Sequence, residues 1–242
     1  MDITQSRIIV TGGASGLGAA CAAHFRALGA RVSIFDLKAE GQDAYAVDVT
    51  SEDDAAGAVA AASQAMGGIT AAVNCAGIAT GARTVGRDGP HDLGLFRKTV
   101  DINLVGSFNI ARLAAAEMAK NTPNADGERG VIVNTASIAA FDGQKGQAAY
   151  AASKAGIAGM SLPMARDLAG LGIRACAIAP GIFLTPMLEG LGQEIIDGLS
   201  ADVTFPKRLG RPEEFAQLAA FIMGAPYLNG ETIRIDGALR MQ

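Results

Sequence analysis

The sequence predicts an α/β fold, in which one domain over residues 1–242 contains a doubly wound, seven-stranded parallel sheet with helices on both faces. Short apolar runs alternate with longer helical segments along the whole chain, and this alternation is typical of a parallel sheet. Half of the 242 residues are hydrophobic, which is enough for a large core. Neither a repeat nor a shift in composition marks a domain boundary.

Seven short apolar runs are the expected strands. They cover residues 7–10, 31–35, 44–47, 70–73, 131–134, 172–179 and 232–235. Helices are expected after the turn 11–18 as far as about 28, from Thr50 or Ser51 onward, from about 93 to 120, and around Tyr150 as far as about 169. The acids after Ser51 suit the first turn of a helix, and Pro163 is a candidate kink in the last one. The glycine-rich segment 80–90 is expected to be a loop.

The turn after the first expected strand spaces its glycines as Gly12-x-x-x-Gly16-x-Gly18. Such glycines let the backbone approach a pyrophosphate, whose charge then lies at the positive end of the following helix. An ordinary connection between a strand and a helix can also be rich in glycine. The position of the turn, directly after the first strand, favours a dinucleotide-binding loop.

Asp36 stands where the second expected strand ends. A carboxylate at this place can accept hydrogen bonds from the adenosine ribose hydroxyls, and it would repel a 2′-phosphate. Neither Ser15 nor Leu37 supplies the positive charge that an NADP site would need. The sequence therefore predicts NAD as the cofactor, although a solvated acid at the end of a strand is the simpler alternative for Asp36 alone.

Tyr150 and Lys154 are four residues apart in an alanine-rich segment, so a helix places both side chains on one face. A free phenol has a pKa of about 10. A neighbouring ammonium is expected to lower the pKa of Tyr150 toward the range in which general acid–base catalysis is efficient. Ser137 follows an apolar run upstream and could hold a substrate oxygen against the Tyr150 hydroxyl. Taken alone, the same spacing also fits a surface tyrosine with a solvated lysine.

Charge and cysteine content narrow the class of protein. A net charge of −4 argues against nucleic acid or an anionic membrane as the main partner. The three cysteines (Cys21, Cys75 and Cys176) are far apart and form no CxxC motif, which favours reduced thiols in the cytoplasm over disulfides or a metal site. The uncharged segment 55–82 is mostly Ala and Gly and is interrupted by polar residues, so we expect a buried helix and strand there.

Together these motifs resemble those of the short-chain dehydrogenase/reductase family. The matching positions are 11–18, Asp48, Val49, 74–77, Asn103, Ser137, Tyr150, Lys154, Pro180 and Gly181. Segments 130–137, 140–150, 162–168, 205–210 and 229–242 are similar to those of family members that oxidise 3-hydroxyacyl-CoA esters, whereas 37–43 and 182–200 depart from them. The resemblance implies a Rossmann fold, a homotetramer, and hydride transfer between NAD and a secondary alcohol.

The resemblance also implies residue roles. Tyr150 would be the general acid and base, Lys154 would lower its pKa and bind the nicotinamide ribose, and Ser137 would orient the substrate oxygen. Asn103 would hold a water that links Lys154 to solvent, unless it is simply a packed asparagine. Gln144 would contact substrate, with a solvated loop residue as an equal alternative. Cofactor contacts are implied for Gly12, Ser15, Gly16, Leu17, Gly18, Asp36, Asp48, Val49, Asn74, Cys75, Ala76, Gly77, Pro180, Gly181, Phe183 and Thr185.

The leading hypothesis is an NAD-dependent dehydrogenase of short- or branched-chain 3-hydroxyacyl-CoA in fatty acid metabolism. Another short-chain reductase, acting on a 3-oxoacyl carrier protein, a steroid or another secondary alcohol, is the alternative. A non-catalytic dinucleotide-binding scaffold is a third reading, but it would be free to lose Tyr150 and Lys154. A substrate lid is expected over about 182–205, with Phe183, Leu184, Met187, Leu188 and Leu191 as its apolar residues. Candidate partners for coenzyme A phosphates are Arg83, Arg87, Lys98 and Lys207, each of which also suits a solvated surface.

Overall fold

Seven parallel strands form one sheet in the order β3-β2-β1-β4-β7-β8-β9 in the computed structural model, which describes residues 1–38, 40–190 and 192–241. The strands are β1 (Arg7–Thr11), β2 (Arg31–Asp36), β3 (Ala44–Ala46), β4 (Ala71–Asn74), β7 (Gly130–Thr135), β8 (Ile173–Pro180) and β9 (Thr232–Ile235). Each pairs with its neighbours in parallel. The predicted fold class is confirmed, and each expected strand lies within about one residue of its predicted bounds.

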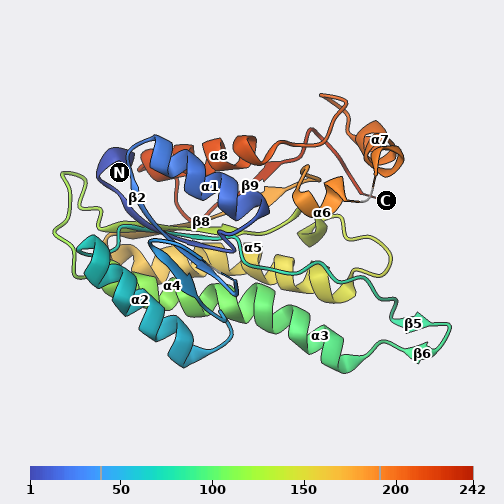
Figure 1. Ribbon diagram of the computed structural model, residues 1–242, viewed down its shortest axis with the longest axis horizontal. Helices are drawn as coiled ribbons and strands as arrows, with labels where there is room; N and C mark the ends of the chain where they lie inside the picture. The colour runs from blue at the N-terminus through green and yellow to red at the C-terminus, as the bar shows by residue number, and fades with distance from the viewer. Residues whose placement is uncertain (39, 191, 242) are drawn as a thin grey trace.

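Helices cover both faces of the sheet (Figure 1). On one face lie α1 (Gly16–Ala27) and α8 (Pro212–Gly224), which share a core cluster that includes Phe25 and Phe215. On the other face lie α2 (Glu52–Met66), α4 (Gly106–Met118) and α5 (Ala148–Leu168). The central strands β4, β7 and β8 are buried at every position, so they read as continuous apolar runs and not as alternating ones. Helix α8 was not among the expected elements.

Local signals set the bounds of α2. The Ser51 hydroxyl accepts a hydrogen bond from the Asp54 amide at 3.2 Å, so Ser51, and not Thr50, caps the helix. Glu52, Asp53 and Asp54 occupy the first turn, where negative charge is favourable. Gly67 ends the helix with a positive φ of 78°.

The long helix expected over 93–120 is divided into three parts. Helix α3 (Leu93–Val100) is followed by a π-helical turn (Asp101–Val105) and then by α4, which ends at Met118. The prediction of one continuous α-helix is therefore wrong at its centre. The helix that carries Tyr150 does continue past Pro163, and a 3₁₀ turn (Ala169–Leu171) follows it.

Two further segments contain more structure than expected. The loop predicted over 80–90 contains a short antiparallel hairpin, β5 (Val85–Gly86) and β6 (Gly89–Pro90), which projects from the body of the chain (Figure 1). The predicted lid contains α6 (Pro186–Glu189) and α7 (Gln193–Asp202), while Leu191 lies outside the described residues.

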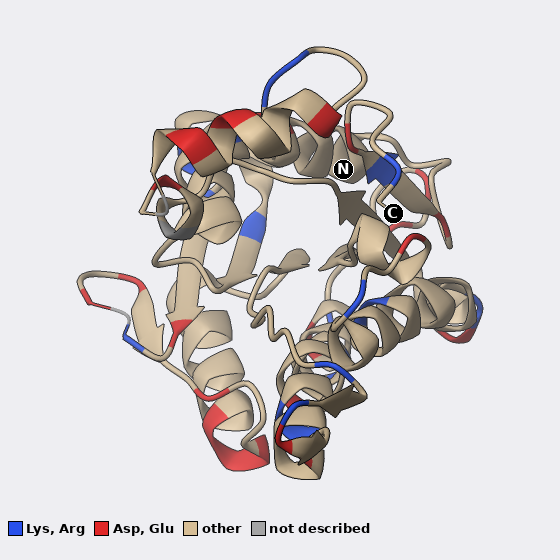
Figure 2. Cartoon of the chain, turned by 90° about the vertical axis from the view of Figure 1, so that its right-hand side faces the viewer, with Lys and Arg blue, Asp and Glu red and all other residues tan. Residues whose placement is uncertain are grey.

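Acidic and basic residues are interspersed around the periphery of the chain (Figure 2). Among the described residues, no helix combines the length and the apolar character that a membrane span requires.

Candidate active site

A cavity of about 830 Å³ opens at the carboxyl ends of β1, β2 and β4. In a doubly wound sheet, ligands bind at this edge, where strand order reverses between β1 and β4. Predicted cofactor residues that line it are Gly12, Ser15, Gly16, Leu17, Gly18, Asp36, Asp48, Val49, Cys75, Ala76, Gly77 and Thr185. Sequence reasoning missed Thr50, Ile78, Arg97, Asp101 and Ile102 in the lining, because loop and helix ends carry no motif that marks them.

Gly12 and Gly18 of the glycine-rich turn have no room for a side chain. A Cβ on Gly12, whose φ is +63°, would lie 2.9 Å from the backbone of Ala76. A Cβ on Gly18 would overlap the carbonyl oxygen of Gly12. Helix α1 begins at Gly16 without an acidic residue in its first turn, so its positive end stays available for an anion. The turn fits the pyrophosphate of a dinucleotide.

Two carboxylates at the cavity are held by neighbouring hydrogen-bond donors. Asp36 Oδ2 accepts a hydrogen bond from the Ala14 amide at 3.2 Å, which ties the end of β2 to the glycine-rich turn. Asp48 Oδ1 accepts from the Thr50 hydroxyl at 2.7 Å and from the Thr50 amide at 2.9 Å. These hydrogen bonds lower the pKa of Asp48, since they favour its charged form.

Ser137, Tyr150 and Lys154 come together beside the end of β7. Ser137 follows this strand and opens the 3₁₀ turn Ile138–Ala140, where its Oγ accepts a hydrogen bond from the Ala139 amide at 3.1 Å. Tyr150 and Lys154 occupy the first two turns of α5. Lys154 Nζ donates to the Thr135 carbonyl at 2.6 Å and lies 5.9 Å from the centroid of the Tyr150 ring.

Burial sets the proton affinities of Tyr150 and Lys154. It raises the pKa of Tyr150, and a hydrogen bond with the Ser137 side chain acts in the opposite direction. It lowers the pKa of Lys154 to about 8, with a smaller opposing effect of Cys75. The net shift of the Tyr150 pKa is therefore upward, opposite to the direction expected from a neighbouring ammonium, because desolvation is the largest effect. The phenol is desolvated, and the ammonium is directed at the Thr135 carbonyl.

Asn103 lies in the π-helical turn and is completely buried. Its Nδ2 donates to the Ile78 carbonyl at 2.9 Å and to Ser153 Oγ at 3.0 Å, and its Oδ1 accepts from the Ile78 amide at 2.8 Å. Ser153 Oγ donates in turn to the Tyr150 carbonyl at 2.7 Å. Asn103 thus connects the segment after β4 to the first turn of α5, and its predicted role in holding a water stays a prediction. Ser153 was missed, although it directly precedes Lys154.

Several predicted residues lie outside the cavity. The Phe183 side chain is in the core, with its ring centroid 6.3 Å from that of Phe215, and its predicted contact with the nicotinamide stays a prediction. Asn74 is buried beneath the site and donates to Asn134 Oδ1 at 2.9 Å. Pro180 ends β8, and the Gly181 amide donates to the Ile235 carbonyl at 2.9 Å. Gln144 is exposed in the loop before α5.

The candidate coenzyme A cations are dispersed. Lys98 lines the cavity. Arg83 and Arg87 line a separate open groove of about 500 Å³ on the β5–β6 hairpin. Lys207 Nζ donates to the Ala201 carbonyl at 3.0 Å near the end of α7.

Residues 6–195 match the family profile described as short chain dehydrogenase, and the chain belongs to this family of oxidoreductases. Particular relatives match over almost its whole length. It is 49% identical to 3-hydroxyacyl-CoA dehydrogenase type-2 of Homo sapiens, over 97% of this chain and 95% of that protein. It is 50% identical to the protein of the same name in Drosophila melanogaster, over 96% of each. The crystal structure of 3-hydroxyacyl-CoA dehydrogenase type-2 from Mycobacterium avium superposes with a TM-score of 0.92 at 45% identity, covering 98% and 97% of the two chains.

Proposed function

We propose that the protein is an NAD-dependent dehydrogenase that interconverts 3-hydroxyacyl-CoA and 3-oxoacyl-CoA with a short or branched acyl chain. The observation that carries this proposal is the identity of 45–50% over nearly the full length to proteins named 3-hydroxyacyl-CoA dehydrogenase type-2. The proximity of Ser137, Tyr150 and Lys154 at the end of β7 supports it chemically.

The residues that would hold NAD are those of the cavity. The glycine-rich turn and the start of α1 would bind the pyrophosphate, Asp36 the adenosine ribose, and Asp48 with Val49 the adenine. When bound, NAD supplies the acceptor for the hydride from the alcohol carbon. The carboxylate of Asp36, fixed by the Ala14 amide, would repel a 2′-phosphate, which supports NAD over NADP.

The chain's own residues handle the proton. The Ser137 hydroxyl would orient the substrate oxygen, while Tyr150 donates its phenolic proton during reduction and takes a proton back during oxidation. Because burial raises the pKa of Tyr150, the phenol is protonated at neutral pH and ready for reduction. Lys154, with a pKa of about 8, stays mostly protonated at neutral pH, so its charge stabilises the phenolate once the proton has left.

We propose a cytoplasmic homotetramer with a role in fatty acid metabolism. Exposed apolar side chains on the layer of α4 and α5 support self-association. They are Val105, Phe108 and Leu162. The three cysteines are far apart in the sequence and form no CxxC motif, which supports a reducing compartment.

Steady-state assays with NADH test the substrate class. We expect reduction of acetoacetyl-CoA, and a lower kcat/KM for the matching pantetheine thioester, because binding energy from the nucleotide end helps to position the reacting carbon. If the protein leaves acetoacetyl-CoA unchanged but reduces a steroid or simple ketone, it still belongs to the family, and the proposed acyl-CoA substrate is wrong.

Tyr150→Phe tests whether Tyr150 is the general acid. We expect kcat to fall by at least ~10²–10⁴ while the Kd for NADH stays within about twofold, because only the proton donor is removed. Turnover near that of the unmodified protein would exclude Tyr150 as the acid.

A further inference from the structure

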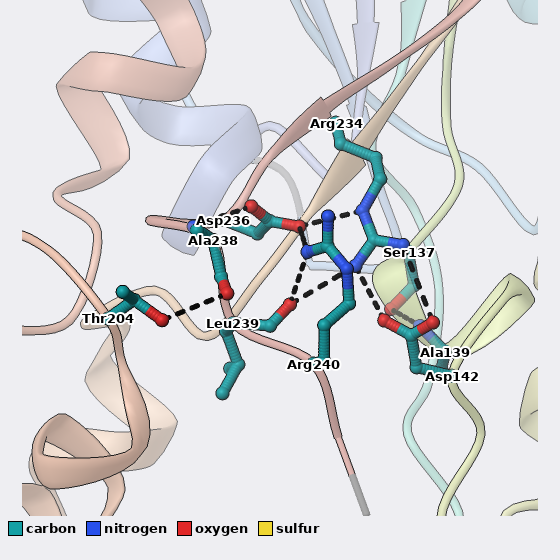
Figure 3. Close-up of polar contacts among 9 residues, drawn as sticks. All are labelled: Ser137, Ala139, Asp142, Thr204, Arg234, Asp236, Ala238, Leu239 and Arg240. Carbon is teal, nitrogen blue, oxygen red and sulfur yellow. Dashed lines mark hydrogen bonds and ion pairs between the residues drawn. The ribbon is translucent and has the colours of Figure 1, made fainter.

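We propose that Arg234 is a positioning residue for the reaction, because it fixes the loop that follows Ser137 to the last strand of the sheet and to the C-terminal residues. The inference rests on the proposed function, in which the Ser137 hydroxyl orients the substrate oxygen. Figure 3 shows Arg234 at the centre of polar contacts between segments that are far apart in the sequence.

The Arg234 guanidinium, which extends from β9, binds two carboxylates at once. Its Nη2 lies 2.6 Å from Asp142 Oδ2 and its Nη1 lies 3.5 Å from Asp142 Oδ1. Its Nε donates to Asp236 Oδ2 at 2.7 Å, and Nη2 also donates to the Leu239 carbonyl at 3.2 Å. The guanidinium carbon lies 5.4 Å from the ring centroid of Phe141. This arrangement uses the planar fork of arginine, which a lysine cannot reproduce.

Asp142 and Ser137 belong to one compact turn. The Ala139 amide donates to Ser137 Oγ at 3.1 Å, the Ala140 amide donates to the Ser137 carbonyl at 3.0 Å, and the Asp142 amide donates to the Ile138 carbonyl at 2.9 Å. Displacement of Asp142 would therefore be transmitted to the Ser137 hydroxyl through hydrogen bonds, without a flexible connection between them.

The turn also rests directly on the helix that carries Tyr150. A Cβ on Gly143 would lie 3.0 Å from Cβ of Ala151, which follows Tyr150 in α5. Arg234 thus holds the loop from the side of β9 while α5 supports it next to the proposed acid.

The other side of the network touches two more segments of the proposed site. Asp236 lies against the turn after β8, because a Cβ on Gly181 would lie 2.9 Å from Asp236 Cα. At the end of the predicted lid, Thr204 Oγ1 donates to the Ala238 carbonyl at 3.1 Å, as Figure 3 shows. Asp236 Oδ1 also accepts a hydrogen bond from the Ala238 amide at 2.9 Å. Through Asp236, Arg234 therefore connects the Ser137 loop to the turn after β8 and to the end of the predicted lid.

The expected effect is on turnover more than on folding. Arg234→Lys keeps a positive charge beside Asp142 and Asp236, whose side chains are 17% and 9% exposed, so neither carboxylate is left without a cation. A displacement of about 1 Å in a positioned group, in contrast, can cost ~10²-fold in rate. Loss of the Arg234–Asp142 contact should lower kcat without a matching loss of cofactor binding.

The experiment combines Arg234→Lys with Ser137→Ala in steady-state reduction of acetoacetyl-CoA by NADH. We expect Arg234→Lys to lower kcat by about 10- to 100-fold while the Kd for NADH, from fluorescence titration, stays within about twofold. In the Ser137→Ala protein, Arg234→Lys should have almost no further effect on kcat, because the hydroxyl that it positions is absent. If Arg234→Lys fails to fold, Asp142→Asn weakens the same contact by removing the carboxylate charge on the loop, and it is measured in the same way.

Arg240→Lys is the matched control. Arg240 Nη1 also contacts Asp236 Oδ2, at 3.1 Å, but its side chain is 59% exposed and, among the described residues, it forms no hydrogen bond with Asp142. The kcat of the Arg240→Lys protein should stay within about twofold of that of the unmodified protein. An unchanged kcat for Arg234→Lys, or the full loss repeated in the Ser137→Ala background, would overturn the positioning role. Normal turnover by Ser137→Ala itself would overturn the proposed role of Ser137 and the inference with it.

Discussion

Replacing Lys154 by Met should remove a rise in the free energy of unfolding that the unmodified protein shows between pH 8 and 10.5. Lys154 is 5% exposed, and its burial lowers its pKa from 10.5 to about 8. The unfolded chain therefore holds a proton on this side chain over a pH range in which the folded protein has released it. Stability rises with pH wherever the unfolded state binds more protons, so this lysine makes the native protein gain stability between pH 8 and 10.5.

The magnitude follows from the width of the window. Each pH unit is worth about 1.36 kcal/mol for one proton, so the 2.5 units between the two pKa values correspond to about 3 kcal/mol. Below pH 8 the protein carries this cost in full.

Urea unfolding at several pH values between 7 and 10.5 measures the effect as the difference in unfolding free energy between the unmodified protein and Lys154→Met. We expect the difference to shift by about 3 kcal/mol in favour of the unmodified protein across this range. Lys145→Met removes a lysine from an exposed loop position and is the matched control. A difference that stays constant with pH would refute the reasoning that burial depresses the pKa of Lys154.

Three further substitutions test other parts of the structure. Asp36→Ala should reduce a preference for NAD over NADP of ~10² or more in kcat/KM, chiefly by weakening NAD, as assays with both cofactors would show. Gly18→Ala should lower NADH affinity at least ~10-fold in a fluorescence titration, because its methyl group would overlap the Gly12 carbonyl. Glu128→Gln should lower the unfolding free energy by about 3 kcal/mol in urea, because it leaves the buried Arg174, 2.7 Å away, without a charged partner.

Features that depend on short stretches of sequence were predicted well. Apolar runs marked the strands, Thr50 or Ser51 was expected at the start of α2, where Ser51 is the cap, and the glycines at 12, 16 and 18 marked the turn at the cavity. In each case the deciding interaction lies within a few residues of the signal.

Features that depend on distant contacts were not predicted. The direction of the Phe183 ring follows from a bridge to Gly210 and from packing on Phe215, both far along the chain. The pKa of Tyr150 depends on how much of the folded protein surrounds the phenol, which a spacing of four residues to Lys154 cannot reveal. The division of the helix at Asp101 has no proline to announce it.

The π-helical turn Asp101–Val105 lets this stretch of chain hold one residue more than an unbroken α-helix would. An α-helix turns by about 100° per residue, so one extra residue in a regular α-helix would rotate everything after it by that angle. The wide turn absorbs the residue locally, so Ile110 keeps its place in the core and Arg112 keeps its ion pair with Glu52 outside it. A change of one residue in length at this turn therefore alters the backbone around Asn103 and leaves α4 in register with α3.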